Sequence, residues 1–295
     1  MTVSSPGLLL VAFLFPAGGA HAPASGPHDR AYWRSIVSSD YAVPEGESAF
    51  ALARELSELR RSPDAELRDT LAYSILAAWV ENPGRFSNEE LGALLDEWRA
   101  GLRSASVLER SFSALCLASL AERDLESPFL GDARYRELLA ETLAYLKSER
   151  DLRGYEEPTG WIHATAHTAD LLKALSRNRL LTAEDQRAVL DAIGVRLASA
   201  PGVFTHGEQG RLARVAAAIV TRPDFDRPAF EAWLGRLREE DRAIGRQKPP
   251  TVQSIAAFEN RTYMLEALAA RLSMEPLSAD GKRARDAVLV ILRNR

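Results

Sequence analysis

The sequence predicts an all-α protein, and three observations support this prediction. Apolar residues recur with helical spacing almost without interruption along the chain. No window shows the alternation of β-branched residues that is typical of strands. Turn residues separate the apolar windows, as at Pro83-Gly84 and Pro201-Gly202, where they are expected to end helices.

Capping residues indicate where several of the predicted helices begin. Ser62 precedes Pro63 as a cap before a proline at the first helical position, and Ser87 with Glu90 has capping-box spacing. Thr182 begins a later helix in the same way. The predicted helices cover residues 29–39, 46–61, 63–82, 88–103, 107–124, 133–149, 161–177, 183–199, 208–221, 227–243, 252–273 and 279–293.

The lengths of these helices and of their connections predict how they are arranged. Helices of roughly 15 to 20 residues joined by short turns favour antiparallel pairs. Pairs that recur about every 40 residues are closer to HEAT-like repeats than to tetratricopeptide repeats. We therefore expect the pairs to stack as a HEAT-like α-solenoid, right-handed or arched.

The N-terminus predicts export. Residues 7–15 form an uncharged apolar run that is too short to span a bilayer, and small residues suited to a signal peptidase follow it. We interpret residues 1–22 as a signal peptide, 23–28 as a linker and 29–295 as a single helical-repeat domain. The expected location is secreted or periplasmic, and the mature chain is expected to lack a transmembrane segment.

Composition narrows the classes of partner and of site. The net charge of −4 and the lack of a basic cluster argue against nucleic acid as a partner. Cys116 is the single cysteine, so an intrachain disulfide cannot form. Its apolar helical surroundings indicate a packing role rather than a nucleophile.

The polar chemistry of the chain is concentrated in residues 151–172. If residues 161–177 are helical throughout, then His163, His167 and Asp170 fan over about 60° of one helix face. Gly154, Pro158 and Gly160 break the preceding segment into a loop. Thr159 or Gly160 is expected to cap the helix.

The motif RGYEEPTGWIHATAHTAD (153–170) resembles the signature of a bacterial all-helical family, domain of unknown function 2785, which has the pattern R-G-[FY]…G-W-x-H-x-x-A-H-x-x-D. The likeness extends from about residue 50 to 275, with FTHGEQGRLA (204–213) as one of the weaker matches. The resemblance implies a helical-repeat fold and a shared polar site, and it implies no activity.

The histidine cluster has two interpretations. Two imidazoles at i and i+4, with Asp170 as third ligand or orienting group, are typical of a site for a divalent metal such as zinc. The glutamate of the zincin motif is missing, so a catalytic base would have to be Glu156, Glu157 or Glu208. Alternatively, Asp170 holds His167, and His163 fixes the loop, in a structural hydrogen-bond network.

Two hypotheses about function follow. In the first, the metal site hydrolyses or modifies a small anionic ligand, or binds it, with Arg153, Tyr155 and Trp161 as binding residues. In the second, the chain is a non-catalytic scaffold for a protein or peptide.

The loop before the helix is expected to fold back over the helix start. At least one of Arg153, Glu156 and Glu157 should then lie within about 5 Å of the histidine pair. The cluster Phe204 to Glu208 is expected to cap its helix, with Glu208 pairing with Arg211, or to supply His206 or Glu208 to the same site.

Overall fold

The computed structural model describes residues 27–294, and this part of the chain is all-α apart from one short hairpin. Its α-helices are α1 Arg30–Ser38, α2 Ala49–Glu58, α3 Ser74–Glu81, α4 Asn88–Gly101, α5 Val107–Glu126, α6 Gly131–Ser148, α7 Ala164–Arg177, α8 Ala183–Ser199, α9 Glu208–Val220, α10 Arg227–Arg246, α11 Val252–Met274 and α12 Ala279–Arg293. A 3-10 turn, η1 Leu59–Arg61, extends α2, and a π-helical segment, η2 Glu66–Tyr73, precedes α3. The hairpin pairs β1 Tyr155–Glu156 with β2 Gly160–Trp161.

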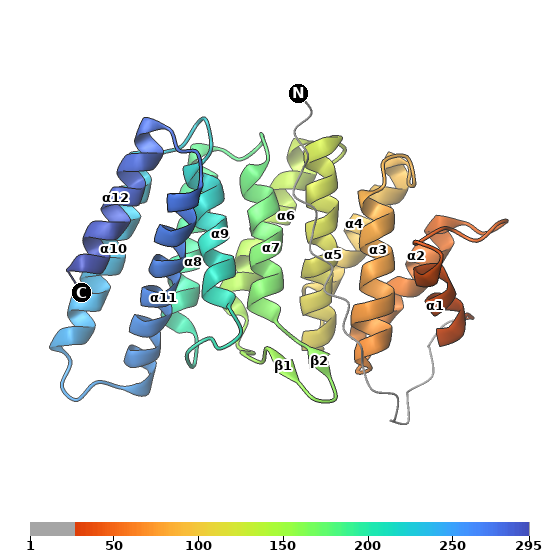
Figure 1. Cartoon of the computed structure of the whole chain (residues 1–295), viewed down its shortest axis with the longest axis horizontal. Helices are drawn as coiled ribbons and strands as arrows, with labels where there is room; N and C mark the ends of the chain where they lie inside the picture. Colours follow the sequence, from red (N-terminus) through yellow and green to blue (C-terminus); the bar gives the residue numbers. More distant parts are fainter. Residues whose placement is uncertain (1–26, 295) are drawn as a thin grey trace.

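The helices form a row that runs from α1 at one end to α12 at the other (Figure 1). Neighbours in the row are α5, α7, α9 and α11, while α6, α8 and α10 lie behind them as a second layer (Figure 1). The hairpin lies at one end of α7, at the middle of the row.

Each predicted helix is present to within three residues at both ends, when η1 is counted with α2 and η2 with α3. The capping signals explain this agreement. Ser87 with Glu90, and Thr182 with Asp185, form reciprocal capping boxes. Each cap satisfies backbone N–H groups that have no partner inside the helix.

One contiguous cluster of buried apolar side chains runs from Trp33 to Ile291. At the middle of the row the residues are small: Ala164, Ala169 and Ala174 of α7 are at most 1% exposed, and Ser111 of α5 is fully buried. Small side chains let helix axes approach closely, so α7 is packed tightly between α5 and α9.

Two local features were not predicted. The hairpin forms where a plain loop was expected, because Gly160 adopts a left-handed conformation (φ +78°) that reverses the chain into β2. The π-helical turn at η2 replaces the regular start of the third predicted helix, and it contains Arg68 and Asp69.

The N-terminal residues interpreted as a signal peptide, and most of the linker, lie outside residues 27–294. Within those residues, no helix has both the length and the apolar composition needed to cross a bilayer.

Candidate functional site

Helix α7 begins at Ala164, three residues later than predicted. Trp161 belongs to β2, and His163 precedes the helix in a left-handed conformation (φ 46°, ψ 34°) that non-glycine residues seldom adopt. The prediction that Thr159 or Gly160 caps the helix is therefore wrong, and His163 does not lie on the helix face with His167 and Asp170. Tertiary contacts must hold His163 in this conformation, because it costs about 1 to 3 kcal/mol.

Arg68 of η2 holds the hairpin in place. Its side chain is fully buried, and Nη2 donates to the carbonyl oxygens of Thr159 at 2.6 Å and of Trp161 at 3.1 Å. The guanidinium also lies 4.7 Å from the centroid of the Phe112 ring. Burial lowers the pKa of Arg68, although Asp69 opposes this effect. A buried cation with these contacts fixes the path of residues 159–161.

Asp69 binds the same hairpin from η2. It pairs with Nη2 of Arg68 at 2.7 Å and accepts the N–H of Trp161 at 3.2 Å. Burial raises the pKa of Asp69 to about 7, and the neighbouring Arg68 and Trp161 N–H only partly counter that effect. The Asp69 carboxyl is thus poised to change its charge near neutral pH.

His163 ties the hairpin to the loop before α9. Its Nε2 must donate to the carbonyl oxygen of His206, 3.0 Å away, because a carbonyl only accepts. The same nitrogen lies 3.6 Å from Oε1 of Glu208, which is 2% exposed. The imidazole stacks on Trp161, with ring centroids 4.8 Å apart. Burial lowers the pKa of His163, although Glu208 opposes this effect, so the neutral form prevails at neutral pH.

His167 lies on α7 beside His163, with ring centroids 5.6 Å apart. Ser111 of α5 donates to the carbonyl of Ile162, so its oxygen accepts from Nδ1 of His167 at 2.7 Å. Burial lowers the pKa of His167 well below its ordinary value, and the nearby His163, Arg211 and Arg68 disfavour its protonation further. Both imidazoles are therefore neutral, and each has one nitrogen that accepts no hydrogen bond from the described residues.

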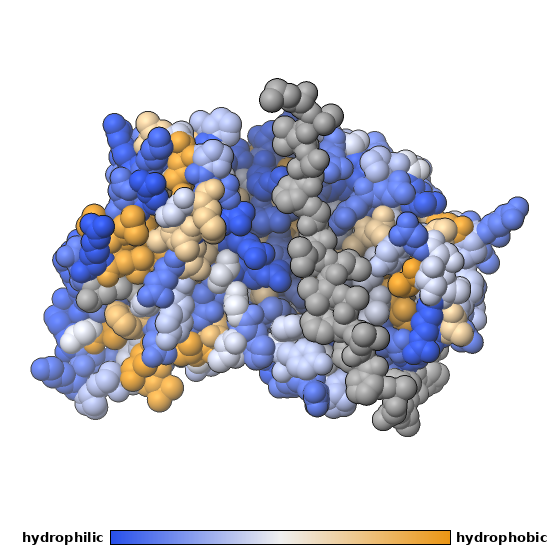
Figure 2. All heavy atoms as spheres, viewed as in Figure 1, coloured by the Kyte–Doolittle hydropathy of each residue, from blue (hydrophilic) through white to orange (hydrophobic). Residues whose placement is uncertain are grey.

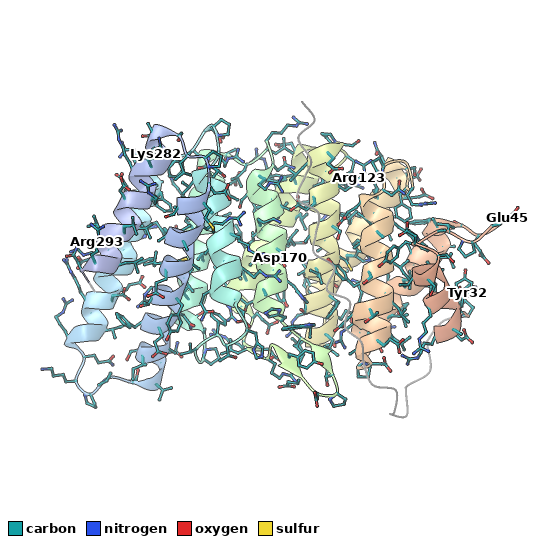
Figure 3. All side chains as sticks on the ribbon, in the orientation of Figure 1. Tyr32, Glu45, Arg123, Asp170, Lys282 and Arg293 are labelled. Carbon is teal, nitrogen blue, oxygen red and sulfur yellow. The ribbon has the colours of Figure 1, made fainter. Side chains whose placement is uncertain are left out.

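Asp170 does not join the histidines. Its carboxylate forms an ion pair and hydrogen bond with Nη1 of Arg211 on α9. Figure 3 shows Asp170 on α7 at the middle of the row. Ser111 takes the role expected of Asp170, that of holding His167. Because Asp170 is paired with the guanidinium of Arg211, it does not fit as a third metal ligand. Residues 27–294 contain no group of three or more His, Cys, Asp or Glu side chains that could hold an ion.

The candidate binding loop faces solvent. The Arg153 side chain pairs with Asp151 at 2.6 Å and with Glu156 at 3.5 Å. Tyr155 is 37% exposed and meets Trp161 edge-on, with centroids 5.2 Å apart. Glu156 and Glu157 are also exposed. Neither glutamate forms a hydrogen bond or ion pair with a histidine among the described residues, so neither is placed as a base.

The loop does fold over the start of α7, but through its backbone. The N–H of His163 donates to the carbonyl of Arg153 at 3.0 Å, which meets the expected distance without bringing a loop charge to the imidazoles. Of the three candidate bases, Glu208 alone lies beside a histidine. Glu208 also accepts the N–H of His206 at 2.9 Å, while Arg211 pairs with Asp170 rather than with Glu208 as expected.

Cys116 lies on α5 and is buried in the core. The thiol is 1% exposed, and burial raises its pKa to about 12. This environment favours the neutral thiol and agrees with a packing role.

Sequence reasoning missed the partners that complete the cluster: Arg68, Asp69, Ser111, Phe112 and Arg211. Each is more than 40 residues from the residue of the 151–170 segment that it contacts. One signal was present, since Arg68 stands between Leu67 and Leu71 on an apolar helix face. A lone arginine in that position indicates a buried partner.

Residues 100–270, more than half of the chain, match the family described as Protein of unknown function (DUF2785). The resemblance in the sequence is confirmed, over a shorter stretch than the expected 50–275. The match contains the hairpin, α7 and α9, whereas η2 lies outside it. No curated protein and no solved structure matches the chain.

Replacing Arg68 with methionine is expected to destabilise the protein by about 3 to 5 kcal/mol, the usual cost of removing one partner of a buried ionic contact. The change leaves the Thr159 and Trp161 carbonyls without a donor. Arg153→Met is the matched control, because it removes an exposed ion pair worth about 1 kcal/mol or less. Urea unfolding of the three proteins measures both effects, and equal losses in the two variants would contradict the role given to Arg68.

The raised pKa of Asp69 predicts a pH-dependent stability. The folded protein binds a proton at Asp69 up to about pH 7, whereas the unfolded chain releases it near its ordinary pKa of 3.8. This contribution to stability is therefore lost as pH rises towards 7.

Asparagine at position 69 cannot ionise. The free energy of unfolding of Asp69→Asn, relative to that of the wild type, should therefore rise by about 2 kcal/mol between pH 5 and pH 8. Other titrating groups are common to both proteins and cancel in the comparison. Thermal unfolding at the two pH values measures the gain. A difference in Tm that stays constant with pH would show that Asp69 is already ionised at pH 5.

Proposed function

The chain belongs to the DUF2785 family, and since that description names no activity, we propose from the geometry that the protein is a non-catalytic interaction scaffold. In this proposal the helical row is a HEAT-like α-solenoid, and the β1–β2 hairpin is its contact surface for a protein or peptide. The histidine cluster is the structural network that holds the hairpin.

One observation carries the proposal: the hairpin is buried on the side of the network and exposed on the other. Two paired residues per strand are too few for a stable hairpin, so the contacts from Arg68 and His163 must hold it. A loop fixed in advance loses less conformational entropy on binding, and this favours affinity. The buried contacts thus fix the exposed side of the hairpin in one conformation before a partner binds.

The exposed side has a composition suited to a protein partner. Tyr155 exposes an aromatic ring that packs edge-on against Trp161. Tyrosine is enriched among the residues that dominate binding energy at protein interfaces. Glu156 and Glu157 add carboxylates next to it. The complementary partner is a segment that has an apolar side chain followed by lysine or arginine.

The row supports the solenoid proposal because each helix packs mainly on its neighbours, as in repeat proteins. Apolar side chains are also exposed towards one end of the row, over α11 and α12, in orange in Figure 2. The exposed hydrophobic residues of these two helices include Val252, Met274 and Val290. Exposed apolar patches are typical of interaction surfaces.

The location that we propose is secreted or periplasmic. The support is the apolar run at residues 7–15 with the small residues that follow it. A scaffold in that compartment would meet its partner outside the cytoplasm.

The proposal predicts a specific crosslink. With a photo-crosslinking amino acid in place of Tyr155, irradiation of cells that express the protein should give one discrete adduct. Glu89, exposed at the start of α4, is the control position. The Glu156→Lys, Glu157→Lys double variant should reduce the adduct at least tenfold, because it repels a basic partner. Identical adducts at positions 155 and 89, or none at 155, would refute the proposal.

A second candidate function is a divalent-metal site, favoured by one observation. Nδ1 of His163 and Nε2 of His167 have no hydrogen-bond partner among the described residues, and neither is among the fully buried polar atoms without a partner. Neutral imidazoles with accessible lone pairs are the form that binds zinc. The metal would have two protein ligands rather than three, and Glu208 is the nearby carboxylate for a hydrolytic step.

Metal content separates the two candidates. Protein purified without a histidine tag and incubated with zinc should retain none after dialysis if the network is structural. Stoichiometric zinc that is lost in a His167→Phe variant would establish the metal site instead. The scaffold proposal would then lose its account of the histidines but not its test at Tyr155.

A further inference from the structure

Residues of α8 and α10 line a groove on the surface of the protein. These two helices belong to the layer behind α7, α9 and α11 (Figure 1). Its volume is about 550 Å³, within the range of small-molecule sites. The lining is mostly apolar and includes Val195, Ala198 and Leu237. The histidine cluster contributes no residue to it.

Trp233 of α10 borders this groove with a polar atom that lacks a partner. The side chain is 1% exposed, and its Nε1 is fully buried without a hydrogen bond. Two other core tryptophans are satisfied, since Trp79 donates to the Tyr41 carbonyl at 2.7 Å and Trp98 to Ser57 at 2.8 Å. Nε1 of Trp33 also lacks a partner, but Trp33 does not line this groove. A buried N–H without an acceptor costs about 1 to 3 kcal/mol, so its occurrence beside a groove points to a bound acceptor.

A second polar atom on the same groove has the same property. The hydroxyl oxygen of Ser199, on α8, is buried and has no hydrogen-bond partner. A hydroxyl and an indole N–H can both donate. Two donors without a partner therefore lie in the wall of the groove.

Gly194 keeps the groove open above the indole. A Cβ at this position would lie 3.3 Å from Nε1 of Trp233 and 3.5 Å from Cδ2 of Leu237. Glycine inside a helix costs about 1 kcal/mol relative to alanine, so its presence in the middle of α8 needs a reason. The space that it leaves beside Trp233 supplies one.

The charges at the rim narrow the class of ligand. Asp191 and Arg236 neutralise each other as an exposed ion pair. Glu240 lies on the same rim and pairs with Arg261 at 3.2 Å. No unpaired cation remains among these groups to attract an anion, and the carboxylates would repel one.

We propose that the α8–α10 groove is a binding site for a small uncharged molecule with an apolar ring and a carbonyl oxygen. The ring packs on Val195, Ala198 and Leu237, and the carbonyl accepts from Nε1 of Trp233. An amide fits this description better than a carboxylate does. The proposal is independent of the scaffold function and of the hairpin.

Binding can be measured from the indole N–H resonance of Trp233 in ¹H–¹⁵N spectra of the whole protein. This resonance is assigned by its absence from the spectrum of the Trp233→Phe variant. N-methylbenzamide is the probe, with toluene as the carbonyl-free control and benzoate as the anionic control. We expect saturable shifts with the amide, and binding at least tenfold weaker with either control. Gly194→Ala should weaken amide binding at least tenfold while leaving the fold intact, because alanine favours the helix.

Val195→Glu is a second variant, which changes a side chain that is 44% exposed and therefore leaves the core untouched. It should also weaken binding of the amide, because it places a carboxylate on the apolar lining. The proposal is overturned if the Trp233 resonance does not respond to the amide. It is equally overturned if toluene binds with the same affinity as the amide. It is also overturned if a bound water is the sole partner of the indole N–H.

Discussion

The middle of the molecule depends on one buried guanidinium. Arg68 is removed from water, and in exchange it donates to the backbone of residues 159 and 161 and contacts the face of Phe112. Desolvation of a cation is costly unless the cation is paired and hydrogen-bonded, so the hairpin carbonyls and Arg68 require each other. The position of β2 then determines where His163 lies, and His163 determines where α7 begins.

The same packing explains the state of the two imidazoles. Alanines and serines on α5 and α7 leave little room between the helices, so both rings are largely buried and their pKa values fall. Neutral rings with defined tautomers act as connectors: His163 reaches the loop before α9, and His167 reaches α5. Burial of these groups is compatible with stability because each connector has a fixed partner.

The sequence predicted the helices because their signals are local. Caps at Ser87 and Thr182, and the apolar period between them, depend on residues within one or two turns. The predictions of where α7 begins and of which residue pairs with Asp170 were wrong for the opposite reason. They depend on Arg68 and Arg211, which are distant in sequence, and helical spacing alone carries no information about such contacts. Glu208 was among the candidate bases, but its place beside His163 had to come from the structure.

In a row of helices that pack mainly on their neighbours, each unit can in principle open separately from the ends. The contacts around His163 work against this, because they join η2, α5, the hairpin and the loop before α9 across some 140 residues of chain. To release the hairpin, the protein must disturb four segments together. The middle of the row should therefore open as one cooperative block, with fraying restricted to the helices at either end.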